Sequence, residues 1–332
     1  MSPDEREVAV MPRVMTLGEA LIDFVPVESG LDLADVPGFT KAPGGAPANV
    51  AVGLCRLGIK SGFIGKLADD AFGRYLHGVL AGNGVDGRGI SFTAEGRTGL
   101  AFISLTASGQ RDFLFYRERG ADTLLEEGDI DRVDLTGAEV LHHGSVSLTG
   151  QPSRGATEKA VQSGRRHGLK ISFDPNLRLS LWPSGAHARD VVCGMMSAVD
   201  LLKLNEEELS FLSGRGDVEE GARWALERQA GLVVVTLGAG GCLFMNRVSQ
   251  GRVPGWPVRA LDTTGAGDAF MAGLLAALLE GAHAGWASLD GDALGQACRF
   301  ANAAAAISTT RMGAIGSLPL KEEVLSFLRE AT

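Results

Sequence analysis

The chain has 332 residues, of which 45% are hydrophobic and 21% charged, a composition typical of a globular protein with one large domain or a domain plus a subdomain. Its net charge of -9 argues against a nucleic-acid surface, because phosphate backbones bind to basic faces. The acidic start, MSPDEREVAVMPRV, does not resemble a signal peptide, and no apolar run approaches the ~20 residues of a membrane-spanning helix. The four cysteines are scattered, which is typical of buried thiols in a reducing compartment. We therefore expect a cytoplasmic protein that binds neither nucleic acid nor membrane.

Short β-like runs alternate with helical runs along the chain. Residues 14–26 are apolar with a glycine interruption, residues 48–58 have helical spacing, and residues 61–70 are expected to form a strand. Four more apolar strands are expected within 140–148, 169–178, 199–209 and 231–241, with helical segments such as 155–168 between them. This alternation predicts an α/β fold with a mostly parallel sheet covered on both faces. Ligands of such sheets bind beyond the carboxyl ends of the strands, so the loops after the strands are the candidate sites.

Residues 90–117 break this pattern. They alternate around the turn ASGQR without a helical period, which predicts a β-hairpin. In a parallel α/β core such a hairpin is either an edge addition or a lid over the site, and the pattern alone does not distinguish the two. Because no repeat or linker interrupts the chain, we expect a single domain over residues 13–332 after an N-terminal extension, residues 1–12.

The strongest functional motif is DTTGAGDAF, residues 262–270. Apolar residues recur at helical spacing after Asp268, so this residue lies at a helix start. Gly265, Ala266 and Gly267 have little or no side chain, so their N–H groups and the helix dipole can converge on an anion. An acidic helix start explains the aspartate alone but not the three small residues before it. The motif therefore indicates an anion hole whose carboxylate can take a proton from a substrate hydroxyl.

Two further motifs are weaker. In KAPGGAPANVA, residues 41–51, Gly44 and Gly45 permit a ligand to approach the backbone, and Asn49 offers a donor and an acceptor. TLGAGG, residues 236–241, is a glycine turn after an apolar strand that either cradles phosphates or simply reverses the chain. The chain has no GxxxxGK[ST] P-loop, and a phenylalanine occupies the third glycine position of a Rossmann fingerprint in DTTGAGDAF.

GGAPANVA and DTTGAGDAFMAGLL, in that order, resemble the two signatures of the ribokinase-like (PfkB) carbohydrate kinases. The resemblance covers the chain from about residue 13, and GEALIDFVP, KAPGGAPANVA, FYRERGAD and DPNLRLSLWPS are similar to the fructokinases within that family. It implies a three-layer sandwich with a small β-sheet lid, whose strands would come from about 26–43 and 90–117. It also implies ATP-dependent phosphorylation of a sugar hydroxyl, with D-fructose giving fructose 6-phosphate as the first expectation.

The resemblance assigns roles to individual residues around the transferred group. It makes Asp268 the general base and gives Gly265, Ala266 and Gly267 the amide hole. The sugar and phosphate contacts that it implies are Asp23, Gly44, Gly45, Asn49, Arg117 and Arg178. Taken alone, a carboxylate at a strand end is usually only solvated, and the alternative for the two arginines is a surface position, so these roles depend on the resemblance.

On the nucleotide side the resemblance implies contacts from Lys203, Asn205, Glu208, Thr236, Gly238, Gly241 and Asn302, the last of which borders adenine. The N-x-x-E pattern of Asn205 and Glu208 is associated with Mg²⁺, although NEEEL alone predicts a helix start with a capping pattern. Many family members also hold a monovalent cation such as K⁺ through backbone oxygens. By position these oxygens would come from Asp262, Thr264, Ser308, Arg311, Gly313 and Ser317. The adjacent His142 and His143 point to opposite faces of a strand and receive no role.

Alternatives remain at this point. The kinases of 2-keto-3-deoxygluconate and ribose share both signatures, and an acidic sugar would make the two arginines essential partners. A non-catalytic sugar-binding regulator would be expected to have lost the base or the anion-hole glycines, which are present. The predicted lid could also pair two copies as a homodimer, because its apolar residues Leu100, Phe102, Ile103, Leu105, Phe113 and Phe115 can pack against a partner or against the ligand.

Overall fold

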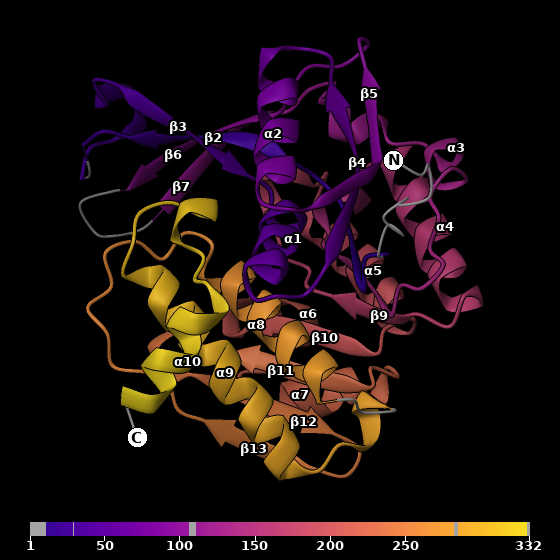
Figure 1. Cartoon of the computed structure of the whole chain (residues 1–332), viewed down its shortest axis with the longest axis vertical. Helices are drawn as coiled ribbons and strands as arrows, with labels where there is room; N and C mark the ends of the chain where they lie inside the picture. Colours follow the sequence, from indigo (N-terminus) through magenta and orange to yellow (C-terminus); the bar gives the residue numbers. More distant parts are fainter. Residues whose placement is uncertain (1–10, 29, 106–110, 282–284, 331–332) are drawn as a thin grey trace, which may run out of the picture.

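The computed structural model describes residues 11–28, 30–105, 111–281 and 285–330 (Figure 1). The predicted N-terminal extension therefore lies almost entirely outside the described residues, as does most of the turn ASGQR. In the part of the chain that is described, no helix has the length and apolar character needed to cross a membrane.

A nine-stranded sheet forms the centre of the molecule, in the order β13-β12-β11-β10-β9-β8-β1-β4-β5. Seven strands run parallel, and β12 and β13 are antiparallel additions at one edge. The parallel strands are β1 (Val14–Leu17), β4 (Ser61–Ala68), β5 (Asp86–Thr93), β8 (Val140–His143), β9 (Lys170–Phe173), β10 (Leu201–Asn205) and β11 (Leu232–Thr236). β12 spans Cys242–Asn246 and β13 spans Gln250–Val253. The strands expected from the apolar runs are thus present, and their carboxyl ends lie at one edge of the sheet.

Helices cover both faces of this sheet, because its strands are apolar on both sides. Met15 and Leu141 pack on one face with α4 (Ser153–Arg166), α5 (Gly185–Met196), α6 (Glu206–Ser213) and α7 (Val218–Glu227). The neighbouring residues Val14 and Val140 pack on the other face with α1 (Ala46–Arg56), α8 (Ala266–Glu280), α9 (Gly291–Thr309) and α10 (Lys321–Glu330). α2 (Ala71–Gly82) packs near α1, and the short α3 (Glu127–Ile130) contacts α4. This arrangement is the expected three-layer sandwich.

The helix α8 is apolar on all sides, which suits a helix inside the molecule rather than on its surface. All but four of its fifteen residues are buried, and it packs between α1 and α9. Its first turn lies at the edge where the parallel strands end (Figure 1). The apolar run after the motif DTTGAGDAF therefore fixes that motif at the ligand-binding edge of the sheet.

A second, four-stranded sheet projects from the body of the molecule at the upper left of Figure 1. Its order is β3-β2-β6-β7, with β2 (Leu21–Pro26), β3 (Phe39–Gly44), β6 (Leu100–Leu105) and β7 (Arg111–Tyr116). The strands predicted for this sheet, within about 26–43 and 90–117, need two corrections. It includes β2 from Leu21 onward, and residues 90–93 belong instead to β5, where they pair with β4 in the large sheet.

The chain passes from one sheet to the other at Gly18, which explains why the run 14–26 is divided. Gly18 has a φ of 152°, and a Cβ there would lie 2.6 Å from Cγ of Pro47. A side chain at this position would therefore collide with the start of α1. The glycine interruption visible in the sequence is the point where β1 ends and the chain turns toward β2.

Candidate active site

A cavity of about 760 Å³ opens between the small sheet, the carboxyl ends of β10 and β11, and the first turn of α8. Fifteen of the predicted site residues line it, although they are distributed over most of the chain. They are Asp23, Gly45, Asn49, Arg178, Lys203, Asn205, Thr236, Gly238, Gly241, Thr264, Gly265, Ala266, Gly267, Asp268 and Asn302. The lining does not include Gly44, Arg117, Glu208, Asp262, Ser308, Arg311, Gly313 or Ser317.

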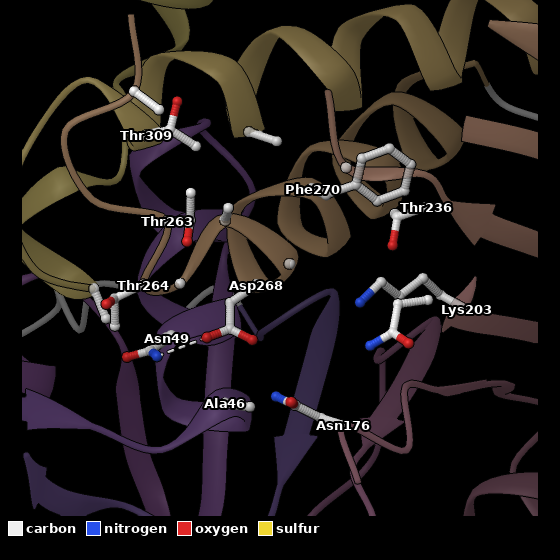
Figure 2. A pocket seen from close by; sticks show the side chains of 18 of the residues that line it. Ala46, Asn49, Asn176, Lys203, Thr236, Thr263, Thr264, Asp268, Phe270 and Thr309 are labelled. Carbon is white, nitrogen blue, oxygen red and sulfur yellow. Dashed lines mark hydrogen bonds between the residues drawn. The ribbon is translucent and has the colours of Figure 1, made fainter. Parts of the chain in front are cut away.

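Asp268 lies in the first turn of α8 and points into the cavity (Figure 2). Its Oδ2 accepts a hydrogen bond of 2.7 Å from Nδ2 of Asn49, which belongs to α1. Burial raises the pKa of Asp268 to about 6, while the hydrogen bond from Asn49 opposes this rise. A carboxylate with a pKa near neutrality is ionised at pH 7 and basic enough to take a proton from a hydroxyl.

The two glycines of the GAGD turn are required for different reasons. Gly265 has a left-handed φ of 76°, and a Cβ there would lie 3.0 Å from Cα of Ala314. A Cβ on Gly267 would lie 3.1 Å from Nζ of Lys203. The N–H of Ala266 makes a long turn bond of 3.3 Å to the Thr263 carbonyl. The first N–H groups of any helix lack a carbonyl one turn earlier, so this turn presents donors and the positive end of the helix to the cavity.

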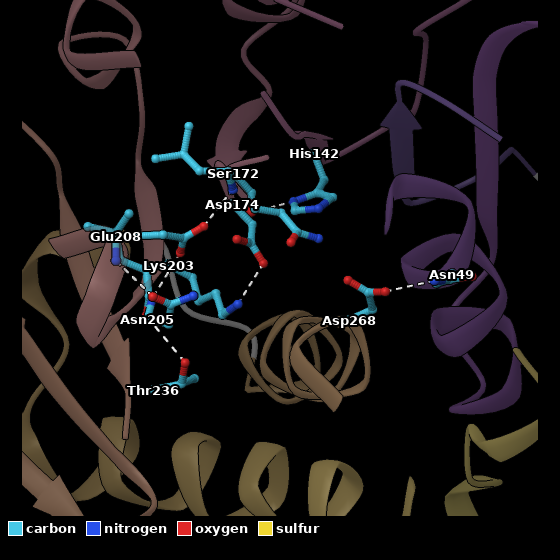
Figure 3. Close-up of polar contacts among 12 residues, drawn as sticks. Asn49, His142, Ser172, Asp174, Lys203, Asn205, Glu208, Thr236 and Asp268 are labelled. Carbon is cyan, nitrogen blue, oxygen red and sulfur yellow. Dashed lines mark hydrogen bonds and ion pairs between the residues drawn. The ribbon is translucent and has the colours of Figure 1, made fainter. Parts of the chain in front are cut away.

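A buried ion pair lies beside this turn (Figure 3). Nζ of Lys203, on β10, is 2.8 Å from Oδ2 of Asp174, which follows β9. Burial by itself would lower the pKa of Lys203, but the carboxylates of Asp174 and Glu208 together outweigh it and raise the pKa. Lys203 is therefore a fixed positive charge at the wall of the cavity.

At the other end of the cavity, Asp23 projects from β2. Burial raises its pKa to about 7, with the charge of Arg178 lowering it and that of Asp268 raising it. Across the strand pair, a Cβ on Gly44 would lie 2.2 Å from Oδ2 of Asp23. Gly44 was expected to contact the sugar, but its position shows another function: it leaves room for the carboxylate that lines the cavity.

Glu19 also lines the cavity and was missed by sequence reasoning. Its Oε1 accepts a 3.1 Å hydrogen bond from the N–H of Ala46, the first residue of α1. Its Oε2 is buried and has no hydrogen-bond partner among the residues described. Burial raises the pKa of Glu19 to about 7. The only available signal was an acidic residue next to the glycine of GEALID, in a run that looked like one strand.

Arg117 was expected to contact the sugar or phosphate, but the structure places it away from the cavity lining. Its Nε donates to Oδ2 of Asp122 at 2.6 Å, and its two other nitrogens donate to Thr149 and to the carbonyl of Val146 at 3.2 Å. The side chain is buried in this network. Arg117 thus anchors the end of β7 to the large domain. Arg178, by contrast, lines the cavity and donates to Oδ1 of Asn176 at 2.6 Å.

Glu208 was expected near magnesium, and its contacts do not fit that role. Its Oε2 accepts from the N–H of Asn205 at 2.9 Å, and its Oε1 accepts from the N–H of Leu177 at 2.7 Å. In return, Oδ1 of Asn205 accepts from the N–H of Glu208 at 2.8 Å. The pair therefore forms the capping box that NEEEL predicts at the start of α6. The glutamates that line the cavity here are Glu206 and Glu207.

The residues predicted to hold a monovalent cation lie before α8, at the end of α9 and in the segment after α9, and Asp262 connects the first of these parts with the last. Its Oδ1 accepts from the N–H and hydroxyl of Thr264, and its Oδ2 accepts from the N–H of Gly313 at 2.8 Å. The hydroxyls of Ser308 and Ser317 donate to backbone carbonyls of their own segments. Within the described ranges there is no group of three or more His, Cys, Asp or Glu side chains arranged to hold a metal.

The remaining part of the cavity lies between the turn after β11 and the helix α9. Thr236, Gly238 and Gly241 line it from the turn, as predicted from TLGAGG. Nδ2 of Asn302 donates to the carbonyls of Val253 and Pro254, so this amide holds the loop that follows β13. That loop adds lining residues that the sequence did not reveal, namely Gly255, Trp256, Val258 and Ala260. The loop has no regular secondary structure and no motif, which is why it was missed.

Residues 11–321 match the family described as pfkB family carbohydrate kinase. Fructokinase-1 of Oryza sativa subsp. japonica is 45% identical over 319 residues, which are 96% of this chain and 98% of the relative. The fructokinase from Vibrio cholerae O395 in fructose, ADP and calcium ion bound form superposes with a TM-score of 0.86 at 36% identity, covering 96% of this chain and 99% of that one. A double mutant of the same enzyme is in fructose, ADP and potassium ion bound form.

The fructokinase with bound ATP from Xylella fastidiosa also superposes with a TM-score of 0.86, at 33% identity over 96% of this chain and 99% of that one. The chain therefore belongs to the pfkB family of carbohydrate kinases, enzymes that transfer a phosphoryl group to an alcohol acceptor. The family, the fold and the similarity to fructokinases within the family, all expected from the two signatures, are confirmed.

Proposed function

We propose that this carbohydrate kinase transfers the γ-phosphoryl group of ATP to D-fructose, giving fructose 6-phosphate. One structural observation carries the proposal. A single cavity joins a carboxylate end, with Asp23 and Asp268, to an end with helix N–H groups, Lys203 and the glycine turn of TLGAGG. The first end suits a polyol, and the second suits a phosphate chain. The fructose, ADP and ATP present in the similar fructokinase structures support the same assignment.

In this proposal Asp268 is the general base. The 2.7 Å hydrogen bond from Asn49 orients its carboxylate, and the raised pKa makes it a better proton acceptor than an exposed aspartate. As Asp268 takes the proton of the attacking hydroxyl, the N–H groups of Gly265, Ala266 and Gly267 and the ammonium of Lys203 stabilise the charge on the transferred group. General-base assistance of this kind typically contributes ~10²–10⁴ in rate.

The donor atoms at the cavity also fit a divalent metal that arrives with ATP, which we propose to be Mg²⁺. The exposed carboxylates of Glu206 and Glu207 line the cavity at the start of α6, and oxygen ligands with retained water suit this ion. Such an ion neutralises part of the phosphate charge. We further propose K⁺ at the segments that Asp262 connects, supported by the potassium ion of the similar fructokinase structure.

We also propose a cytoplasmic location and a homodimer. All four cysteines are free, which suits a reducing compartment. The small sheet supports the dimer. Phe115 lines the cavity, while the neighbouring Leu114 and Tyr116 are exposed on the other face, where a second copy could cover them. Ile103 is buried within the molecule, and the side chains of Leu105 and Phe113 lie outside the described residues.

The first experiment measures ADP release from MgATP with fructose, 2-keto-3-deoxygluconate, ribose, glucose and adenosine. We expect turnover on fructose and a loss of ~10²-fold or more in Asp268→Asn. The matched control is Asp292→Asn, because Asp292 is an exposed aspartate in the first turn of α9. Turnover on the keto acid alone would replace the substrate but keep the mechanism. Sugar binding without any turnover would contradict the kinase proposal and favour a regulator.

The structure bears on the acidic-sugar alternative. A substrate carboxylate would need arginines at the cavity, but Arg117 forms an ion pair with Asp122 instead. Arg178 is then the only member of the predicted arginine pair that lines the cavity. This arrangement favours a neutral sugar such as fructose.

A further inference from the structure

We infer that Asp174 is a positioning residue for phosphoryl transfer, which holds the Lys203 ammonium against the first turn of α8. The inference rests on the proposed function. Asp174 appears in DPNLR but in none of the predicted site roles, and it does not line the cavity. It therefore acts through Lys203 and not by contact with a substrate.

The geometry places Lys203 between two elements. Asp174 follows β9 and Lys203 is on the adjacent β10, so neighbouring parallel strands bring the pair together. Their 2.8 Å contact is buried, with relative exposures of 4% for Asp174 and 5% for Lys203. On its other side, Nζ lies 3.1 Å from where a Cβ of Gly267 would be. Figure 3 shows Lys203 reaching from β10 toward Asp174, near the start of the helix that carries Asp268.

This position is electrostatically unusual. A cation next to a helix N-terminus is unfavourable, because that end of the helix carries a partial positive charge. The arrangement becomes favourable when an anion lies between the amides and the ammonium, as the transferred phosphoryl group would. A buried ion pair is also a weak source of stability, since desolvation offsets much of its attraction. The pair is therefore better explained by a requirement for charge at this point than by folding.

Asp174 has a further feature that a purely structural residue would rarely keep. Its Oδ1 is buried and has no hydrogen-bond partner within the described part of the chain. Most buried polar atoms are paired, and exceptions concentrate where function requires them. Burial is the main cause of the raised pKa of Asp268, and the negative charge of Asp174 raises this pKa further. The hydrogen bond from Asn49 and the charges of Lys203 and Arg178 lower it.

Other charged groups around the pair complete the environment. Glu208 on α6 interacts with both Lys203 and Asp174. Its charge raises the pKa of Lys203, and its own pKa is raised first by burial and then by the charge of Asp174. His142 on β8 is buried, and burial, His143 and Lys203 lower its pKa to about 3, so it adds no positive charge at neutral pH. Asp174 is thus the carboxylate that hydrogen-bonds the ammonium directly.

The test is a double-mutant cycle with Asp174→Asn and Lys203→Met, assayed for fructose phosphorylation. Asparagine keeps the shape of the side chain but removes its charge. We expect kcat to fall about 10- to 100-fold in Asp174→Asn, as for the loss of a charged hydrogen bond, with the KM for fructose within about threefold of wild type. At pH values above the acid limb, Asp174→Asn should lower kcat by less than about twofold in the Lys203→Met background, because its positioning effect passes through the lysine.

A pH profile separates positioning from a merely structural role. Removing the negative charge of Asp174 should shift the acid limb of the pH profile, where kcat falls as Asp268 is protonated, to lower pH. The reason is that this charge raises the pKa of Asp268. Removing Lys203 with Lys203→Gln should move the limb to higher pH, since its charge lowers that pKa. If Asp174→Asn does not fold, Lys203→Gln alone tests the pair: unchanged kcat or an unmoved limb in the folded variant would overturn the inference.

The control is Asp200→Asn, at the opposite end of the same strands, where Oδ2 of Asp200 accepts from the N–H of Ile171. We expect this variant to keep the wild-type kcat and acid limb. Additive effects in the cycle, or a fructose KM that rises as much as kcat falls, would overturn the role of Asp174. Wild-type protein without turnover on any sugar would instead overturn the proposed function, so the two failures are distinguishable.

Discussion

Burial is the largest influence on the pKa values of three acidic residues of the cavity. It raises the pKa values of Glu19 and Asp23 to about 7 and that of Asp268 to about 6. The three carboxyls come from the segment around β2 and from α8, and all line one cavity. Their raised pKa values place protonation close to neutral pH, where it can control sugar binding and proton transfer.

We predict that activity is lost as pH falls through this range. Asp268 works as a base only when ionised, and its folded-state pKa is raised, so kcat should have an acid limb near pH 6. The ratio kcat/KM for fructose should fall from about pH 7, because it also reports ionisation of Asp23 in the free enzyme. The measurement is steady-state kinetics from pH 4.5 to 9 with wild type and Asp23→Asn.

The Asp23→Asn variant serves as the internal control for that profile. It should bind fructose more weakly while keeping the limb of kcat near pH 6, because Asp268 and its hydrogen bond to Asn49 remain. An acid limb near pH 4 in wild type, where an exposed aspartate titrates, would contradict the buried-base interpretation.

At the scale of elements, the spacing of apolar residues predicted helices and strands correctly where burial is uniform along the element. The helix after GAGD and the strands before TLGAGG and NEEEL have one apolar pattern each, and each forms as expected. The run 14–26 could not be assigned in the same way, because both halves are apolar and only Gly18 marks the change of sheet. Residues 90–93 continue the alternation of the hairpin, yet they pair with β4. Alternation identifies a strand but not the sheet that it joins.

The motif NEEEL shows a second limit, since the same letters suit a helix cap and a metal site. We predict that Glu208→Gln lowers the free energy of unfolding by about 1–3 kcal/mol, because its amide group cannot accept from both the Asn205 and Leu177 N–H groups. The KM for MgATP should stay within about threefold of wild type. Urea denaturation and steady-state kinetics measure the two effects.

Glu207→Gln is the matched comparison on the same helix turn. Its side chain is exposed and lines the cavity, so we expect unchanged stability and a raised KM for MgATP. The opposite pattern, with stability lost in Glu207→Gln and nucleotide affinity lost in Glu208→Gln, would restore Glu208 as the nucleotide contact.

At the scale of the whole molecule, the site depends on contacts between distant segments. The motifs located Asp268, Asn49 and the glycine turns because local spacing alone marks a helix start or a close backbone approach. Glu19, Asp174 and Trp256 have no such local mark. They reach the site region through strand order and loop packing, as when the parallel pairing of β9 and β10 places Asp174 beside Lys203. Single-sequence patterns do not encode that pairing.

One face of the small sheet is exposed, because nothing within the described chain covers it fully. Leu114 and Tyr116 on β7 are 44% and 61% exposed, and Tyr116 packs edge-on against Phe102, which stacks on Phe24 at 4.8 Å. β7 is also the strand at one edge of this sheet. An apolar face beside an open edge favours pairing with a second copy.

We predict that the protein sediments as a dimer and that Leu114→Glu combined with Tyr116→Glu converts it to a monomer, because two buried charges would face the partner. The control is Val248→Glu, at a position 65% exposed in the turn between β12 and β13, which should leave the dimer intact. Sedimentation velocity at micromolar concentrations measures all three proteins. Since Phe115 lines the cavity from the opposite face of the same strand, the monomeric variant should also show a raised KM for fructose. A wild-type protein that sediments as a monomer would refute the pairing and leave Leu114 and Tyr116 as surface residues.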